Sequence, residues 1–139
     1  MYLVDSSAWI EYLRPGGAPA VKARVREILG REEACSCGVV VLEVLRGART
    51  EKDWTALYEA LTALPQIPLD AAVIRRAGRW GFQLDRSGAT FSTTDLLIAA
   101  AAHGRAILLH RDADFTRLAG AVGLKEEFAA EQPVQRHQP

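Results

Sequence analysis

The chain has 139 residues, of which 49% are hydrophobic, and its 17 basic and 17 acidic residues cancel. This length suits one ordinary domain with a full core, and the composition excludes a wholly disordered chain. Because there is no basic excess, no strong positive field attracts nucleic acid, and any such binding must rest on a local patch.

Membrane insertion is not expected from this sequence. The run from Met1 to Val4 lacks the basic leader and long apolar stretch of a signal peptide, and the apolar run 96–102 is too short to span a bilayer. The two cysteines, Cys35 and Cys37, do not complete the four-ligand pattern of a zinc site with three distant histidines. We therefore expect reduced thiols and a cytoplasmic protein.

The first half of the chain predicts two strands, each followed by helices. The first strand ends at an acid, two serines offer helix N-caps, and Pro15 and Gly30 end the next two helices. Valines 39–41 favour a strand by propensity, but the residues after them favour a helix. The expected elements are a strand over 2–5, helices within 6–14 and 21–30, a strand over 33–37 and a helix over 38–47.

The second half continues the alternation of strands and helices. Thr50 and Asp53 resemble a capping box, and Asp70 caps the next helix. Pro68 indicates an edge position for the third strand. The expected elements are a helix from 50 to 64, a strand over 66–69, a helix over 70–84, a loop over 85–92, a helix from about 94 to 103, a strand over 106–109 and a helix from 114.

This order of elements predicts an α/β fold. Strands that alternate with helices indicate a mostly parallel central sheet, here of four to five strands, with helices on both faces. A single domain over residues 1–128 accounts for the pattern. Residues 129–139 are polar and contain prolines, so we expect a frayed tail.

Four acids occupy corresponding places in this topology. Asp5 and Asp112 each follow an apolar strand, while Asp95 and Glu43 lie early in helices that leave the strands. In open parallel sheets, ligands bind beyond the carboxyl ends of the strands. Carboxylates gathered there repel one another by roughly 4 kcal/mol per pair at 4 Å and an effective dielectric of 20, unless a cation is bound among them. A Mg²⁺ or Mn²⁺ site for phosphodiester chemistry is therefore the first hypothesis.

Each acid taken alone has an ordinary explanation. Asp5 and Asp95 are placed as helix caps, Glu43 as a solvated helix position, and Asp112 and Asp114 as turn residues. Only their joint placement favours a metal site.

Four segments resemble the successive motifs of PIN-domain proteins, and their order and spacing are similar to those of VapC-type toxins of bacterial toxin–antitoxin pairs. The resemblance covers Met1 to about Leu124. The four segments are Leu3–Ile10, Leu42–Ala48, Thr94–Ala100 and His110–Phe115.

The resemblance implies a single PIN-like domain and a metal-dependent endoribonuclease that cuts structured cellular RNA, tRNA or rRNA. It implies catalytic and metal-binding roles for Asp5, Glu43, Asp95 and Asp112, and a further metal position for Asp114. Supporting roles fall to Ser6, Ser7 and Thr94. It also implies Mg²⁺ or Mn²⁺ as the cofactor, a homodimer, and a VapB-type antitoxin as partner. His110 stands where the family usually has threonine or serine, and we expect it to be a packed or surface imidazole.

Phosphate contacts need basic residues near the acids. Arg46 follows Glu43 by one turn, Arg86 precedes the third motif, and Arg111 lies inside the last, so these three are the candidates for RNA binding. Ordinary surface arginines are the alternative for each. Helices near the N-terminus, with Trp54 and Tyr58, are the expected antitoxin and dimer surfaces.

Two other functions fit part of the pattern. A receiver-like phosphoacceptor domain also binds magnesium with clustered acids, but it needs a second acid beside Asp5 and a lysine after a late strand. A non-catalytic RNA-binding or processing module on the same fold stays open, and metal-dependent cleavage separates it from a nuclease.

Overall fold

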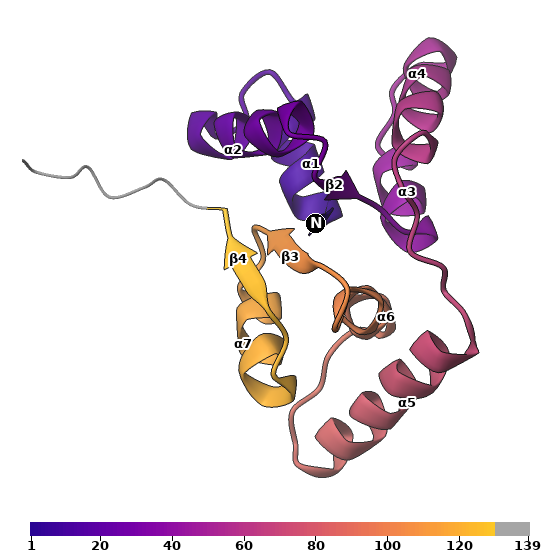
Figure 1. The fold of residues 1–139 in the computed structure, drawn as a ribbon, viewed down its shortest axis with the longest axis vertical. Coiled ribbons are helices and arrows are strands. Elements are labelled where there is room, and N and C mark those ends of the chain that lie inside the picture. The colour runs from indigo at the N-terminus through magenta and orange to yellow at the C-terminus, as the bar shows by residue number, and fades with distance from the viewer. Residues whose placement is uncertain (130–139) are drawn as a thin grey trace, which may run out of the picture.

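The computed structural model describes residues 1–129. The predicted tail therefore lies, apart from Ala129, outside the described residues. In chain order the elements are β1 (Tyr2–Val4), α1 (Ser6–Leu13), α2 (Pro19–Gly30), β2 (Ala34–Cys35), α3 (Gly38–Leu45), α4 (Glu51–Thr62), α5 (Ala71–Arg86), α6 (Thr93–Ala102), β3 (Ile107–His110), α7 (Ala113–Val122) and β4 (Glu126–Phe128). Figure 1 shows their arrangement.

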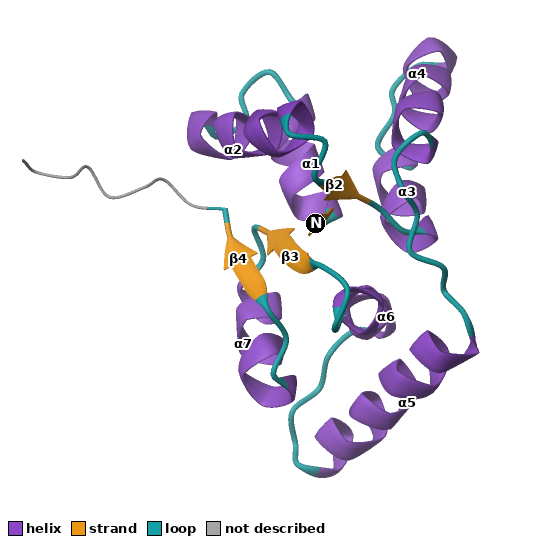
Figure 2. Cartoon of the chain, viewed as in Figure 1, coloured by secondary structure: helices purple, strands orange, loops and turns teal. Residues whose placement is uncertain are grey.

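The strands form one parallel sheet in the order β2-β1-β3-β4. Leu3 pairs with Cys35 on one side and with Leu108 on the other, which makes β1 central. Helices α1 and α2 lie on one side of the strands, and α6 and α7 lie on the other (Figure 2). The predicted α/β class, with helices on both faces of a mostly parallel sheet, is confirmed for the described residues.

The third predicted strand is wrong, and the fourth observed strand was not predicted. Residues 66–69 make only one bridge, between Ser36 and Gln66. Pro65 and Pro68 lack the backbone N–H groups that a longer ladder needs. Beside β3 the sheet ends instead at β4, where two glutamates precede Phe128 and give no β signal.

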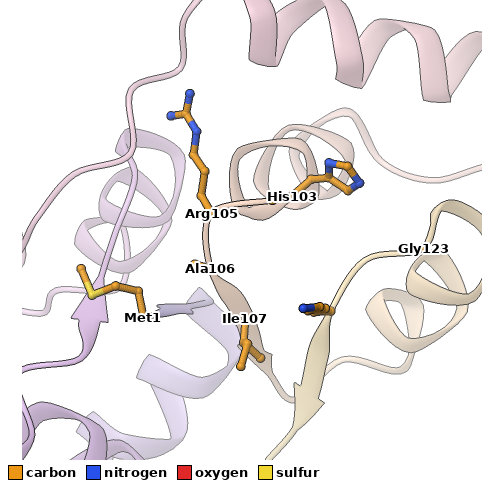
Figure 3. A pocket seen from close by; sticks show the side chains of 8 residues that line it. Met1, His103, Arg105, Ala106, Ile107 and Gly123 are labelled. Atoms are coloured by element: carbon orange, nitrogen blue, oxygen red, sulfur yellow. The ribbon is translucent and has the colours of Figure 1, made fainter.

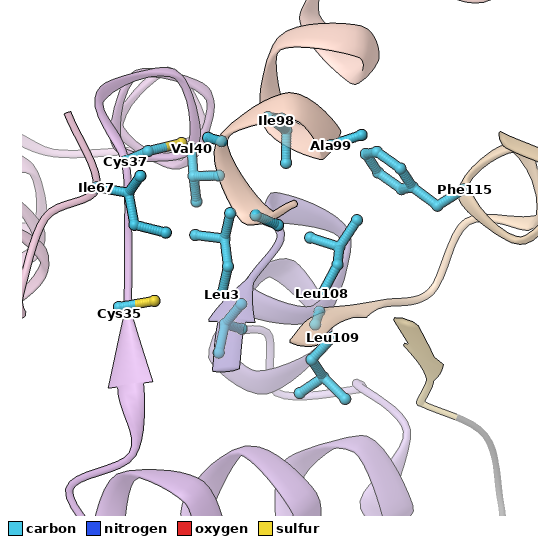
Figure 4. Close-up of a cluster of buried hydrophobic side chains, with 14 of the residues drawn as sticks. Leu3, Cys35, Cys37, Val40, Ile67, Ile98, Ala99, Leu108, Leu109 and Phe115 are labelled. Atoms are coloured by element: carbon cyan, nitrogen blue, oxygen red, sulfur yellow. The ribbon is translucent and has the colours of Figure 1, made fainter. Parts of the chain in front are cut away.

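Neighbouring residues of β3 serve opposite layers of the core. The side chain of Leu108 lies toward Phe115 and Ile98, whereas that of Leu109 points the other way (Figure 4). This alternation is the period of two of a strand. Six of the ten residues of α6 are buried, consistent with its nearly uniform apolar sequence and its central place.

Helix α3 begins at Gly38, as the sequence predicts, whereas β2 covers only Ala34–Cys35 and is shorter than the predicted strand. Cys37 is the N-cap of α3, and the valines 39–41 are helical. Val40 and Val41 are buried, and burial outweighs the weak preference of β-branched residues for strands. Cys35 and Cys37 are free, buried thiols, as expected. Within residues 1–129, no helix is both long and apolar enough to cross a membrane.

Candidate metal centre

Asp5 lies directly after β1, and its side chain begins α1. One carboxylate oxygen, Oδ2, accepts hydrogen bonds from the backbone N–H and the hydroxyl of Ser7. Only 3% of Asp5 is exposed. Its other oxygen, Oδ1, is buried and has no hydrogen-bond partner among the described residues. A buried carboxylate oxygen without a donor is costly unless a cation or solvent reaches it.

Asp112 lies between β3 and α7, and Asp114 lies in the first turn of α7. Asp112 is the N-cap of α7, and its Oδ1 accepts the backbone N–H of Asp114 at 2.9 Å. The preceding residue, Arg111, donates its backbone N–H to the Ser7 hydroxyl at 2.9 Å. Since Ser7 also donates to Asp5, the two strand ends that carry these acids are joined through one serine.

Asp95 reaches the same place from α6. Ser92 is the N-cap of that helix and accepts the backbone N–H of Asp95 at 3.1 Å, which puts the acid in the first turn. One carboxylate oxygen each from Asp95, Asp112 and Asp114 lies within 4.8 Å of the others. In the described part of the chain these three form the one group of metal-type ligands at such separations.

Glu43 projects from the second turn of α3 toward this group. Its Oε1 accepts the hydroxyl of Ser6 at 3.4 Å. Burial raises the pKa of the Glu43 carboxyl, and the negative charges of Asp5 and Asp95 raise it further. Mutual repulsion of this kind requires that the carboxylates be near one another.

Burial also raises the pKa values of Asp5 and Asp95, and it is the largest cause for both. The charges of Asp112, Asp5 and Asp114 raise the pKa of Asp95 further. Oxygen-only ligands at close spacing, with one oxygen lacking a donor, suit a hard divalent cation such as Mg²⁺ or Mn²⁺. The residues present therefore fit the metal that the sequence predicts.

The sequence relatives agree with this geometry. A model of the PIN domain matches residues 2–121. The chain is 38% identical over 131 residues to VapC ribonuclease Mb1587 of Mycobacterium bovis, covering 90% of this chain and 96% of that protein. The chain belongs to the PIN-domain family and, within it, to the VapC-type ribonuclease toxins. Ribonuclease VapC18 of Mycobacterium tuberculosis is 31% identical over 92% of this chain and 94% of its own length.

Solved structures share the PIN fold. FitAcB from Neisseria gonorrhoeae superposes with a TM-score of 0.74 at 19% identity, over 95% of this chain and 100% of that one. DNA-bound VapBC from Salmonella typhimurium superposes with a TM-score of 0.74 at 16% identity, over 93% and 98%. At such low identity, the likeness shows the PIN fold alone.

The remaining predicted residues of this PIN domain surround the acids to different degrees. Arg46, at the end of α3, is exposed, and its charge lowers the pKa of Glu43, so it lies near the acids. Arg111 turns its guanidinium to the carbonyl oxygen of Ala129 at 2.7 Å. Arg86 lies over the Phe82 ring at 4.1 Å, at the far end of α5, and no contact joins it to the acids. Thr94 contacts Ser92, with 3.3 Å between the hydroxyl oxygens.

A pocket at the opposite edge of the sheet is not part of this centre. It is lined by residues before β1, β3 and β4, among them Met1, Arg105 and Lys125 (Figure 3). Because all strands are parallel, this is their amino end, whereas the acids follow the carboxyl ends.

Two residues near the acids were not predicted from the sequence. Arg117 donates to Asp114 Oδ1 at 3.2 Å. The spacing of three residues between Asp114 and Arg117 on a predicted helix could have indicated this contact. Glu126 contacts the imidazole of His110 at 2.6 Å, and no sign was available because β4 was not predicted.

Proposed function

We propose that this chain is a Mg²⁺- or Mn²⁺-dependent endoribonuclease that hydrolyses structured RNA, tRNA or rRNA, and acts in the cytoplasm as the toxin of a toxin–antitoxin pair. The observation that carries the proposal is a group of three acids at the starts of α6 and α7, to which we add Asp5 and Glu43. Asp95, Asp112 and Asp114 lie within 4.8 Å of one another.

The chain's own residues have separable roles in this proposal. Asp95, Asp112 and Asp114 would hold the ion, with Asp5 offering Oδ1 because Ser7 occupies Oδ2. Ser6 orients Glu43 by donating to Oε1. When bound, a divalent ion polarises phosphate oxygens and lowers the pKa of water. Hydrolysis with departure of the 3′ oxygen leaves a 5′ phosphate and a 3′ hydroxyl.

Phosphate contacts fall to arginines beside the acids. Arg46 is exposed and close enough to Glu43 to lower its pKa, which makes it the best supported of the three candidates. Arg111 is already hydrogen-bonded to Ala129, and Arg86 covers Phe82, so both are weaker candidates.

RNA cleavage by the purified chain tests this function. Freed of any antitoxin and supplied with Mn²⁺, wild type should cut cellular RNA at sites that mapping of new 5′ ends reveals. The RNA cleavage rate of Asp95→Asn should be about 100-fold or more below that of wild type. A bound metal supplies several kcal/mol of charge stabilisation, and each 1.36 kcal/mol changes the rate tenfold.

The matched control is Asp53→Asn. Asp53 also lies in the first turn of a helix, three residues after a capping hydroxyl, Thr50, but it is not part of the acidic group. Its cleavage rate should equal that of wild type. Intact RNA with wild type and Mn²⁺ would favour a non-catalytic RNA-binding module, which a retained affinity for RNA would reveal.

The partners of the proposed toxin are a VapB-type antitoxin and a second copy of the chain. Their support is apolar surface on α1, α3 and α4: Trp54 and Tyr58 stack with ring centroids 5.3 Å apart, and each is nearly half exposed. Ile10, Leu13 and Leu42 are also exposed. Molecular mass by light scattering, alone and with the candidate antitoxin, checks both partners, and a monomer that ignores the antitoxin would exclude them.

A further inference from the structure

His110 is a fully buried polar residue at the edge of the acidic centre. It ends β3, two residues before Asp112, and its exposed fraction is 0%. Its ring lies near Phe115 and Phe128, with centroids 5.4 and 5.6 Å away. An imidazole between two aromatic rings has little freedom to rotate.

Both ring nitrogens of His110 have partners. Nδ1 accepts the backbone N–H of Asp112 at 3.2 Å, and Nε2 lies 2.6 Å from Oε2 of Glu126. A nitrogen that accepts a hydrogen bond carries no proton, so Nε2 carries the hydrogen and donates to Glu126. The glutamate thus selects the tautomer whose Nδ1 can accept from Asp112.

The backbone around His110 is held to the end of β4 as well. The carbonyl oxygen of His110 accepts the backbone N–H of Ala129 at 2.7 Å, and Arg111 donates a guanidinium N–H to the carbonyl oxygen of Ala129 at 2.7 Å. The two consecutive backbone N–H groups of this turn donate to different side chains. That of Arg111 goes to Ser7, which donates to Asp5, and that of Asp112 goes to His110.

We propose that His110 and Glu126 are a positioning pair that orients Asp112 toward the metal centre. The inference rests on the proposed function, because it assumes that Asp112 binds the ion. Asp112 contacts Asp114 through its side chain and His110 through its backbone, so the direction of its carboxylate is set from both sides. Removal of such outer partners of a metal ligand typically weakens metal affinity by 10–100-fold.

Two substitutions at one position separate the two contacts of the ring. In His110→Asn the amide ends near the place of Nδ1, so an oxygen remains for the N–H of Asp112 while Glu126 loses its partner. In His110→Gln the longer amide reaches toward Nε2 and Glu126, while the N–H of Asp112 loses its acceptor. Both remove the imidazole, so both test the same loss of packing against Phe115 and Phe128.

The experiment measures the Kd for Mn²⁺ by calorimetry on the full chain, with the metal-free melting temperature as a check of folding. We expect His110→Gln to bind Mn²⁺ at least about 10-fold more weakly than wild type. His110→Asn should stay within about threefold, even if its metal-free melting temperature falls as far or further.

The outcomes distinguish the two proposals. Wild type that binds no Mn²⁺ contradicts the proposed function itself. Wild type that binds, with His110→Gln binding as tightly, overturns the positioning role alone. Equal weakening in both variants, or a larger loss in His110→Asn, also overturns it, because the ring would then act only by filling space.

Discussion

Two acids of this PIN domain, Asp5 and Asp112, bond the backbone as well as serving the proposed metal. Asp5 begins α1 and Asp112 begins α7, so the explanation of each as a helix cap is correct as far as it goes. Asp95 lies in the first turn of α6. The residue types could be predicted from their places after strands and at helix starts. Which oxygens lack a donor, as Oδ1 of Asp5 does, could not be, because it depends on how Ser7 folds back.

Asp5→Asn should change how the metal-free protein responds to pH. Burial raises the pKa of Asp5 above 3.8, and it raises those of Glu43 and Asp95 as well. A carboxyl whose pKa is higher in the folded state favours folding below its unfolded pKa, and this contribution is lost as pH rises through the folded pKa. Metal-free wild type should therefore lose stability from about pH 4 upward. Asp5→Asn should lose less stability over the same pH range, since asparagine keeps the helix cap without the buried charge.

Urea unfolding from pH 4 to 8, after metal removal, measures this difference in the free energy of unfolding. Asp70→Asn is the matched control, because Asp70 also caps a helix by accepting a backbone N–H, that of Val73, but is exposed. Its stability should follow wild type across the range. Parallel curves for wild type and Asp5→Asn would show that the buried charge carries no such penalty.

At the scale of elements, local sequence was sufficient to predict a strand or helix where an apolar run and a capping residue occur together. Strand β1 and helix α6 combine apolar runs with caps, and both lie where expected. Residues Val39–Val41 were correctly predicted as helical against the strand propensity of valine, and the burial of Val40 and Val41 agrees with that prediction. Strand β4 could not be predicted, since Glu126 and Glu127 bond side chains elsewhere in the fold, to His110 and Arg24.

The turn between α1 and α2 allows a prediction about stability, because one of its glycines lies against α1. A Cβ added at Gly17 would lie 1.7 Å from the carbonyl oxygen of Glu11, whereas at Gly16 nothing lies within 4 Å. Gly17→Ala should therefore force the turn apart and lower the free energy of unfolding by about 1–3 kcal/mol or more. Urea denaturation measures it.

Gly16→Ala is the neighbouring control. Neither glycine has a positive φ, so alanine at 16 is unstrained and should be neutral or stabilise by up to about 1 kcal/mol. Equal stabilities of the two variants would mean that Gly17 does not lie against α1 as described.

At the scale of the whole molecule, the metal centre is a product of topology. Parallel strands with helical crossovers bring acids from Asp5 to Asp114, 109 residues apart in the chain, toward one edge. The sequence was enough to predict that Asp95, Asp112 and Asp114 meet, because β3 and the helices α6 and α7 were correctly placed. The sequence was not enough to show that Asp95, Asp112 and Asp114 lie within 4.8 Å of one another while Asp5 and Glu43 are outside that group. That distinction depends on side-chain contacts between several elements.

Metal binding should consequently stabilise the whole fold. An ion held by acids from several elements binds the folded state and not the unfolded chain, so it stabilises by RT ln(1 + [L]/Kd), about 2.7 kcal/mol at 100 times Kd. In a domain of this size that is a rise in melting temperature on the order of 10 °C. Calorimetric melting of the full chain with Mn²⁺ and with a chelator, at matched ionic strength, measures it. The double variant Asp95→Asn with Asp112→Asn keeps both helix starts, since Ser92 still caps α6 and asparagine can cap α7, but it loses two of the three closest carboxylates. Its melting temperature should rise in the metal-free state, because repulsion is relieved, and should no longer respond to Mn²⁺. A response as large as that of wild type would place the ion elsewhere on the molecule.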